Sequence, residues 1–260
     1  MAKKKKIINP FQDNGTVRIN KYLSDAGVCS RRQADKYIED GKVTIDGQEA
    51  KLGDRVSKEN EVRVNGKLVS YQEDLILIAF NKPVGVECTE DKSVPNNIID
   101  YINYGKRISY IGRLDKDSQG LILLTNDGDL NQLIAKGSNY HEKEYIVRVN
   151  KPINEDFIEG ISGPVPILGR HTRPSIVTPI NKYTFRIIIT QGMNRQIRRM
   201  CEHFGYRVTK LKRIRVVNIT LGRLKEGTYR NVTQEELAEL KAIIENKEND
   251  EWLIWGNYGR

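Results

Sequence analysis

The sequence predicts an α+β protein with two domains of unequal size. Strand patterns outnumber helix patterns and follow no regular βαβ repeat, which favours a large mixed or mainly antiparallel sheet flanked by helices. The polar segment SYQEDL, residues 70–75, separates a short front part from a longer remainder. We therefore expect a small domain at 16–70 and a larger one at 75–245, between a flexible basic arm at 1–15 and a tail at 246–260.

The charge balance indicates a polyanionic partner. The chain has 43 Lys and Arg against 34 Asp and Glu, a formal charge of +9. Such an excess suits RNA, DNA or an anionic membrane better than a small neutral substrate. The longest purely apolar run, Leu75–Phe80, is far too short to span a bilayer, so a membrane is the weakest of these partners. The N-terminus has a charged start but no apolar stretch, which disfavours secretion.

The cysteines and histidines form no recognisable site. Cys29, Cys88 and Cys201 lie far apart and form no CxxC, and the three histidines are equally scattered. This spacing disfavours a zinc site or a disulfide framework and favours a reducing, cytoplasmic location. The sequence also contains no P-loop or dinucleotide fingerprint. We expect chemistry without a metal.

The pattern of residues 16–70 predicts two helices followed by two or three short strands. TVRINKYLSDAG is a short helix that Gly27 stops, and SRRQADKYIEDG is a second one, with Ser30 and Gln33 as a capping box and Gly41 at its end. KVTIDG and EVRVNGK are strands that enter an Asp-Gly and an Asn-Gly turn. By charge alone, the cations of this part fit a solvated surface. They are Arg18, Lys21, Arg31, Arg32 and Lys42.

The pattern of residues 75–245 predicts buried strands and three helices. LILIAFNKPVG and LILLT are strands buried on both faces, YTFRIIITQG and RVTKLKRIRVVNITL are further strands, and KEYIVRVN alternates with Tyr145 on its apolar face. One helix follows NDGDL, and TQEELAELKAIIENK is another, with a capping box of Thr233 and Glu236. NRQIRRMCEHFGY is the third, with an apolar stripe of Ile197, Met200, Cys201 and Phe204.

The stretch GRLDKDSQG, residues 112–120, places Asp115 between two cations, directly before the buried run LILL. Spacing alone favours an ordinary turn carboxylate, with Arg113 as a helper charge and Tyr145 as a common core aromatic. The alternative is a functional acid, because a carboxylate at the edge of a buried sheet needs a cation partner. Such a partner favours the ionised form, which can attack an electrophilic carbon or stabilise a developing cation.

The RQIRRM helix offers the candidate cation. By helical periodicity Arg198 lies beside the apolar stripe and can reach inward to Asp115, whereas Arg195 and Arg199 point away from it and suit phosphates. Periodicity is equally compatible with all three arginines lying in solvent.

Two resemblances add to this interpretation. RINKYLSDAGVCSRRQADKYIEDGKVTIDG resembles the S4 RNA-binding domain, which implies that Arg31, Arg32 and Lys42 contact RNA phosphates. Arg18 is a further RNA-binding candidate of this part. GRLDKDSQGLILLTNDG, KEY and QGMNRQIRRM, in this order behind an S4-like part, resemble the RsuA/RluB/RluE/RluF family of pseudouridine synthases over nearly the whole chain. YHEKEY, GPVPILG and RRMCEHFGY are most similar to the RluF branch, which modifies large-subunit (23S) ribosomal RNA.

The family resemblance implies a role for each candidate residue. Asp115 matches the essential aspartate, Tyr145 the tyrosine that stacks on the target base, and Arg198 the basic residue that pairs with the aspartate. Ile197 matches an apolar residue of the pocket, and Arg113 an arginine that helps to extrude the nucleotide.

The implied reaction breaks the uridine N1–C1′ bond, rotates the base and rejoins it through C5. The target must leave its stack, because no side chain reaches C1′ inside paired RNA. As an isomerisation it needs no cofactor, metal or external acceptor. We expect a monomeric cytoplasmic enzyme whose partner is ribosomal RNA, with transfer RNA as a further candidate.

Two alternatives stay open. The same chemistry on small-subunit ribosomal RNA or on a tRNA fits the sequence, since structured RNA is recognised largely by shape and unstacked loops. A non-catalytic RNA-binding factor of ribosome assembly would explain the charge and the S4-like part equally well. It would not explain why Asp115, Tyr145 and Arg198 all match the functional residues of the synthase family.

Overall fold

The computed structural model describes residues 15–70, 74–136 and 140–249. The predicted basic arm, apart from Gly15, and most of the predicted tail therefore lie outside the described residues. The chain divides into two compact units. The first holds the residues up to Ile76 together with Tyr104–Ser109 and Thr125–Leu130, and the second holds the rest.

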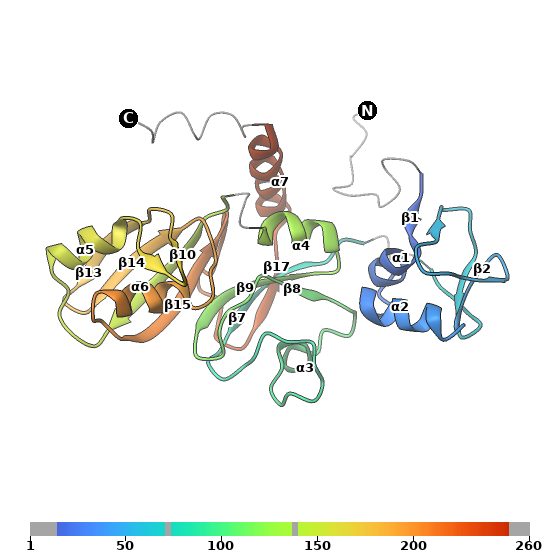
Figure 1. The fold of residues 1–260 in the computed structure, drawn as a ribbon, viewed down its shortest axis with the longest axis horizontal. Helices are drawn as coiled ribbons and strands as arrows, with labels where there is room; N and C mark the ends of the chain where they lie inside the picture. Colours follow the sequence, from blue (N-terminus) through green and yellow to red (C-terminus); the bar gives the residue numbers. More distant parts are fainter. Residues whose placement is uncertain (1–14, 71–73, 137–139, 250–260) are drawn as a thin grey trace. The chain divides into compact units, whose positions relative to one another are not determined.

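The first unit contains two helices and six short strands. Helix α1 covers Ile19–Asp25 and α2 covers Arg31–Glu39, and the two pack against each other (Figure 1). A four-stranded sheet has the order β3-β2-β5-β6, and β1 pairs with β4. The strands are β1 Val17–Arg18, β2 Val43–Ile45, β3 Gln48–Glu49, β4 Arg55–Val56, β5 Val62–Val64 and β6 Lys67–Leu68.

The helix cap and the two turns that the sequence predicts in this unit are present in the structure. The Ser30 hydroxyl accepts a hydrogen bond from the Gln33 N–H at 3.2 Å at the start of α2. At the two hairpin turns, Asp46 and Gly47 have φ of 51° and 81°, and Asn65 and Gly66 have φ of 50° and 74°. Two successive positive φ values define the type I′ turn, which Asn-Gly and Asp-Gly favour. The core is apolar: Leu23, Ala34, Val43 and Val56 are fully buried.

The second unit is built on a nine-stranded mixed sheet. Its order is β13-β14-β10-β15-β9-β7-β17, with β16 on β15 and β8 on β9. β15 runs parallel to β9, whereas β10 is antiparallel to both β14 and β15. The strands are β7 Leu77–Lys82, β8 Ser109–Ile111, β9 Gln119–Thr125, β10 Lys143–Val149, β13 Ile176–Asn181, β14 Thr184–Ile189, β15 Val208–Val216, β16 Ile219–Thr220 and β17 Tyr229–Asn231. The short strands β11 Pro166–Ile167 and β12 Arg170–His171 pair separately. The predicted large mixed sheet is confirmed.

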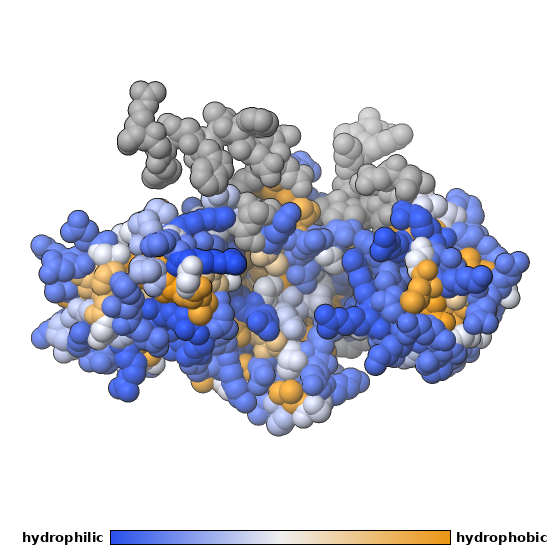
Figure 2. All heavy atoms as spheres, in the orientation of Figure 1, coloured by the Kyte–Doolittle hydropathy of each residue, from blue (hydrophilic) through white to orange (hydrophobic). Residues whose placement is uncertain are grey.

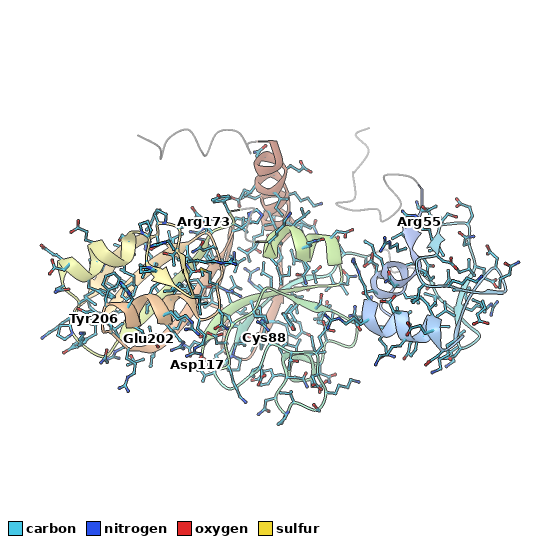
Figure 3. All side chains as sticks on the ribbon, in the orientation of Figure 1. Arg55, Cys88, Asp117, Arg173, Glu202 and Tyr206 are labelled. Atoms are coloured by element: carbon cyan, nitrogen blue, oxygen red, sulfur yellow. The ribbon has the colours of Figure 1, made fainter. Side chains whose placement is uncertain are left out.

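Helices α5 (Glu155–Ser162) and α6 (Gln196–His203) cover one face of β14, β10 and β15 (Figure 1). The Phe157 ring on α5 lies 5.4 Å from the Phe185 ring on β14 and 6.1 Å from that of Phe204 at the end of α6. It also stacks at 4.0 Å on Tyr206, which is labelled in Figure 3. A Cβ at Gly160 would lie only 2.6 Å from the Phe204 ring, so any larger residue here would force the ring to move. Tyr145 and Val147 point into the covered face, and both are buried.

The remaining helices are α3 (Ile98–Ile102), α4 (Gly128–Ala135) and α7 (Gln234–Asn249). The capping box of α7 is complete: Glu236 N–H donates to the Thr233 hydroxyl at 3.2 Å, and Thr233 N–H donates to the Glu236 carboxylate at 2.9 Å. The helix continues past residue 245, into what the sequence assigns to the tail. No helix in the described ranges is long and apolar enough to cross a membrane.

The surface that Figure 2 shows is mostly hydrophilic, with small separate apolar areas. Large apolar side chains that are exposed include Val84, Leu168, Ile176 and Ile180.

Candidate active site

The loop with Asp115 joins β8 to β9 and rests on the turn after β7. Gly85 N–H donates to the Lys116 carbonyl at 2.8 Å, and Ser118 N–H donates to the Asp115 carbonyl at 3.0 Å. Leu114 is buried and anchors the loop in the core. The Asp115 side chain is 34% exposed, so the carboxylate is held at a defined place and stays accessible.

A close approach of two strands fixes where this loop begins β9. Gly120 pairs with Arg213 on β15, and its φ is +105°. A Cβ at this position would lie 2.2 Å from the Arg213 carbonyl oxygen, far inside any tolerated contact. The last residue of GRLDKDSQG therefore has to be glycine, because β15 passes directly beside it.

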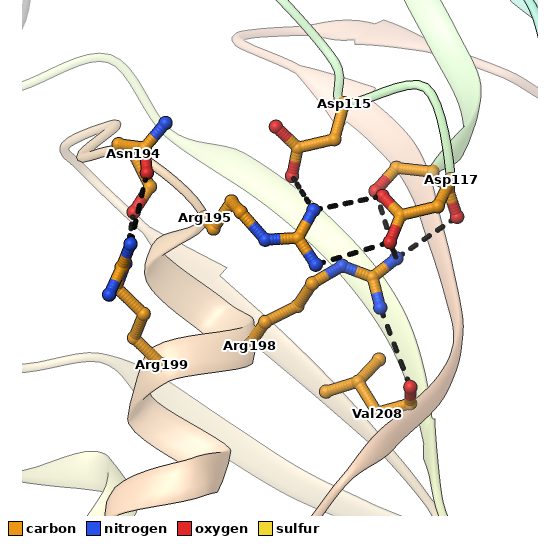
Figure 4. A network of polar contacts seen from close by, with 8 residues as sticks. Asp115, Asp117, Asn194, Arg195, Arg198, Arg199 and Val208 are labelled. Atoms are coloured by element: carbon orange, nitrogen blue, oxygen red, sulfur yellow. Dashed lines mark hydrogen bonds and ion pairs between the residues drawn. The ribbon is translucent and has the colours of Figure 1, made fainter.

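The cation nearest to Asp115 is Arg195, and the predicted pairing with Arg198 is wrong. Arg195 Nη1 lies 3.7 Å from Asp115 Oδ2 (Figure 4). Arg195 has φ 51° and ψ 34° and stands immediately before the first residue of α6. Helical periodicity predicts that the Arg195 side chain points away from the loop. In the structure it reaches the loop instead. It is 40% exposed.

Asp117 binds both arginines, and sequence reasoning missed it. Arg195 Nη1 and Nη2 donate to its two carboxylate oxygens at 3.2 Å each, and Arg198 Nη2 lies 3.3 Å from Oδ2 (Figure 4). Partial burial raises the pKa of Asp117, but the Arg195 hydrogen bond and the charges of Arg198 and Arg195 outweigh it, so the pKa lies below the usual value. The only available signal was a second acid two residues after Asp115.

Arg198 is buried, as the apolar stripe predicts, and it fastens α6 to the loop. Its guanidinium donates to the Asp117 carbonyl at 3.0 Å, to the Ser118 hydroxyl at 3.3 Å and to the Val208 carbonyl at 3.4 Å (Figure 4). Its Nε has no partner among the described residues. Arg198 therefore acts on Asp115 through the loop and not by direct contact.

Tyr145 lies on β10, opposite Ile187 on one side and Arg213 on the other. It is 7% exposed, and its hydroxyl makes no hydrogen bond to any residue of the described ranges. Ile197, the pocket residue that the resemblance implies, is buried on α6. Arg213 is 2% exposed: its Nε donates to the Leu121 carbonyl at 2.6 Å, while Nη2 has no partner in the part of the chain described.

A fully buried lysine, Lys82, ends β7 next to this loop. Its ammonium group donates to the carbonyls of Pro83 at 2.9 Å and Val86 at 2.8 Å, and burial lowers its pKa. Neighbouring Cys88 is also buried, which raises the pKa of its thiol. Sequence reasoning assigned no role to Lys82. Its charge adds to the positive surroundings of the two loop carboxylates.

Residues 76–203 match the RNA pseudouridylate synthase family and residues 17–62 match the S4 domain. The chain is 51% identical over 239 residues to the dual-specificity RNA pseudouridine synthase RluF of Escherichia coli K12. The aligned residues cover 91% of this chain and 82% of that protein. It is 32% identical over 241 residues to ribosomal large subunit pseudouridine synthase B of Bacillus subtilis, with coverages of 89% and 98%. The chain belongs to the RNA pseudouridine synthase family.

The fold agrees with this membership. A crystal structure of a pseudouridylate synthase superposes with a TM-score of 0.63 at 28% identity and covers 86% of this chain and 99% of the other. The resemblances on the S4-like part and on the GRLD, KEY and RQIRRM stretches are thereby confirmed.

The candidate RNA-binding residues divide between the two units. Arg18, Arg31, Arg32 and Lys42 are all exposed on the first unit, the S4 domain. Lys42 pairs with Asp40 at 2.7 Å, and this hydrogen bond raises the pKa of Lys42. In the synthase unit, Arg199 is partly buried and donates to the Asn194 carbonyl at 3.1 Å. Arg113 is exposed and makes no hydrogen bond or ion pair with the described residues.

The arrangement suits attack by a carboxylate on RNA. Asp115 is accessible and has positive surroundings, yet no hydrogen bond to a described side chain occupies its oxygens. Asp117 takes the direct bonds from Arg195 and Arg198. Asp115 therefore keeps free lone pairs while it remains in a positive field, and both properties favour a nucleophile. No group of three or more His, Cys, Asp or Glu residues within the described ranges could hold a metal ion.

Proposed function

We propose that this synthase isomerises uridine to pseudouridine in ribosomal RNA and that its substrate is the large-subunit rRNA. The single observation that carries the proposal is the accessible Asp115 beside Arg195. It lies in a loop that the ion pairs of Asp117 with Arg195 and Arg198 fasten to the start of α6. The names of the relatives support the substrate: one is a large-subunit synthase, and RluF is called dual-specificity. A transfer RNA, which the sequence also leaves open, is the second target that we propose.

In the proposed mechanism, the target uridine leaves its stack and enters the site. Extrusion costs a few kcal/mol. Exposed Arg113 offsets part of this cost by filling the vacated place, and Tyr145 by stacking on the base. Asp115 then promotes cleavage of the N1–C1′ bond. C1′ rejoins the base at C5, C5 loses its proton and N1 gains one, so atoms and charge balance without a cofactor.

The remaining assignments are proposals of the same kind. Arg198 positions the loop, Ile197 lines the pocket, and Arg195 and Arg199 meet the RNA backbone. We propose that the enzyme works in the cytoplasm as a monomer. Equilibrium sedimentation with and without RNA tests the monomer, and a dimer in the free protein would contradict it.

Tritium release from ribosomal RNA labelled at uridine C5 tests the reaction, because each turnover replaces the C5 hydrogen. We expect release with the wild type and none with Asp115→Asn, whose RNA affinity should stay nearly unchanged. Mapping the modified uridine then identifies the substrate among large-subunit, small-subunit and transfer RNA. Tight binding without release from any of these RNAs would favour the non-catalytic assembly factor.

A further inference from the structure

The face of β10, β14 and β15 that is turned away from Tyr145 carries three cations without a partner among the described residues. Along β10, Tyr145, Val147 and Val149 point to the helices, so Ile146 and Arg148 point to the opposite face. Lys210 on β15 lies directly opposite Arg148, and Lys212 lies opposite Ile146. Residues opposite each other on antiparallel strands share a face. Arg148, Lys210 and Lys212 thus form one row, named the basic strip below.

The basic strip lacks the carboxylates that neutralise other cations of the same sheet. Arg215 pairs with Glu142 at 3.0 Å and with Glu144 at 2.7 Å, and Arg186 lies 3.6 Å from Glu144. None of the three cations of the basic strip makes a hydrogen bond or an ion pair with the described residues. Like charges directly opposite each other destabilise a strand pair. The pairing of Arg148 with Lys210 therefore carries a cost in the free protein.

A shallow pocket of about 370 Å³ adjoins the strip. Its lining residues are Arg148, Val149, Asn150, Tyr183, Thr209 and Lys210. Asn150 Oδ1 accepts a hydrogen bond from the Arg207 N–H at 2.7 Å. This bond fixes the orientation of the amide, whose N–H₂ group makes no hydrogen bond with the described residues and can donate to a ligand. Two cations, an amide donor and an aromatic ring in one concave place are the groups that hold an RNA phosphate and its sugar.

We propose that the basic strip and its pocket bind the phosphate backbone of an RNA segment other than the one that holds the target uridine. The proposal rests on RNA being the substrate of this enzyme. Charge complementarity selects the occupant, since a phosphate between Arg148 and Lys210 removes their mutual repulsion. The opposite orientation of Tyr145 separates this segment from the target nucleotide. Lys210 and Lys212 are about 7 Å apart along the strand, a spacing comparable to that of successive phosphates in one RNA strand.

The test compares two RNAs by filter binding across a salt series. One is a full-length large-subunit rRNA transcript, and the other is a short hairpin around the uridine that tritium release maps. For Arg148→Gln/Lys210→Gln we expect the Kd for the transcript to rise on the order of tenfold at physiological salt and the salt slope to fall by about two. The Kd for the hairpin should change less than about twofold, because the hairpin reaches only the active-site side.

Arg223→Gln/Lys225→Gln, which removes two exposed cations between β16 and β17, is the matched control and should leave both affinities unchanged. The midpoint of thermal unfolding of the strip variant should stay equal or rise, because a repulsion is removed. Equal losses for both RNAs, an equal loss in the control, or no loss at all would overturn the proposal. If no RNA is modified, the transcript arm still decides on the strip, so its failure and that of the proposed reaction are distinguishable.

Discussion

Asp117→Asn is the change that tests most directly how the active site works. The wild-type carboxylate receives two hydrogen bonds from Arg195 at 3.2 Å and an ion pair from Arg198 at 3.3 Å. An asparagine keeps one acceptor oxygen but loses the charge. Arg195, which already lies 3.7 Å from Asp115, then turns to that carboxylate, and Arg198 loses its charged partner in the loop. Attack by Asp115 would first have to break the new contact with Arg195, in a loop that is held less firmly.

The size of the effect follows from exposure. Asp117 and Arg195 are 49% and 40% exposed, so their pair is screened and contributes no more than about 1 kcal/mol. Arg198 is 9% exposed, and a hydrogen bond from such a group contributes about 1.5–3 kcal/mol, which the exposure of Asp117 reduces. A total of about 1–2 kcal/mol corresponds to a loss of about five- to thirtyfold in kcat.

Single-turnover tritium release and filter binding measure the two consequences separately. We expect kcat to fall and the Kd for RNA to change less than about threefold. Asp117→Glu should recover part of the rate, because it restores the charge. Asp91→Asn removes an exposed carboxylate whose hydrogen bonds within the described part of the chain go only to Ser93, so it serves as the control and should be fully active. An unchanged kcat in Asp117→Asn would refute the reasoning.

The stability of the same variant gives the pH dependence. Because the pKa of folded Asp117 lies below its unfolded value, its contribution to stability is present above the unfolded pKa. It is lost as the pH falls through the folded pKa. Thermal unfolding of wild type and Asp117→Asn should therefore differ at neutral pH and converge in acid. A constant difference between pH 7 and pH 3 would show that the charge of Asp117 does not stabilise the fold.

Three further predictions concern other parts of the molecule. Gly120→Ala places a Cβ 2.2 Å from a backbone oxygen of β15, so we expect a loss of roughly 3 kcal/mol in the free energy of unfolding, measured with urea; a loss below about 0.5 kcal/mol would contradict the close approach. Arg198→Met keeps the buried stem but frees the loop, and tritium release should fall on the order of a hundredfold; normal release would mean that Arg195 alone holds the loop. Arg31→Gln/Arg32→Gln should weaken RNA binding and lower its salt slope by about two, and an unchanged slope in filter binding would exclude both residues as phosphate contacts.

The sequence was sufficient wherever a signal is local. The Ser30 cap, the two type I′ turns and the Thr233–Glu236 capping box depend on residues no more than three positions apart, and all of them form. The buried strands β7 and β9 were readable from their uninterrupted apolar runs. The contact between Gly120 and Arg213 could not be predicted from the sequence, because it joins residues far apart in the chain and depends on the order of strands in the sheet.

The error at Asp115 has a specific physical cause. Helical periodicity places a side chain correctly only for residues that have helical φ and ψ. Arg198 and Arg199 are inside α6 and obey it, whereas Arg195 stands before the helix at φ 51°, where the chain direction differs and the side chain swings to the loop. Asp117 was passed over because an acid between a cation and a serine in a turn resembles surface. Both misjudged residues lie outside regular structure, and together they leave Asp115 in a positive field without a direct hydrogen bond. The surroundings of Asp115 are therefore set by residues whose placement helical periodicity does not predict.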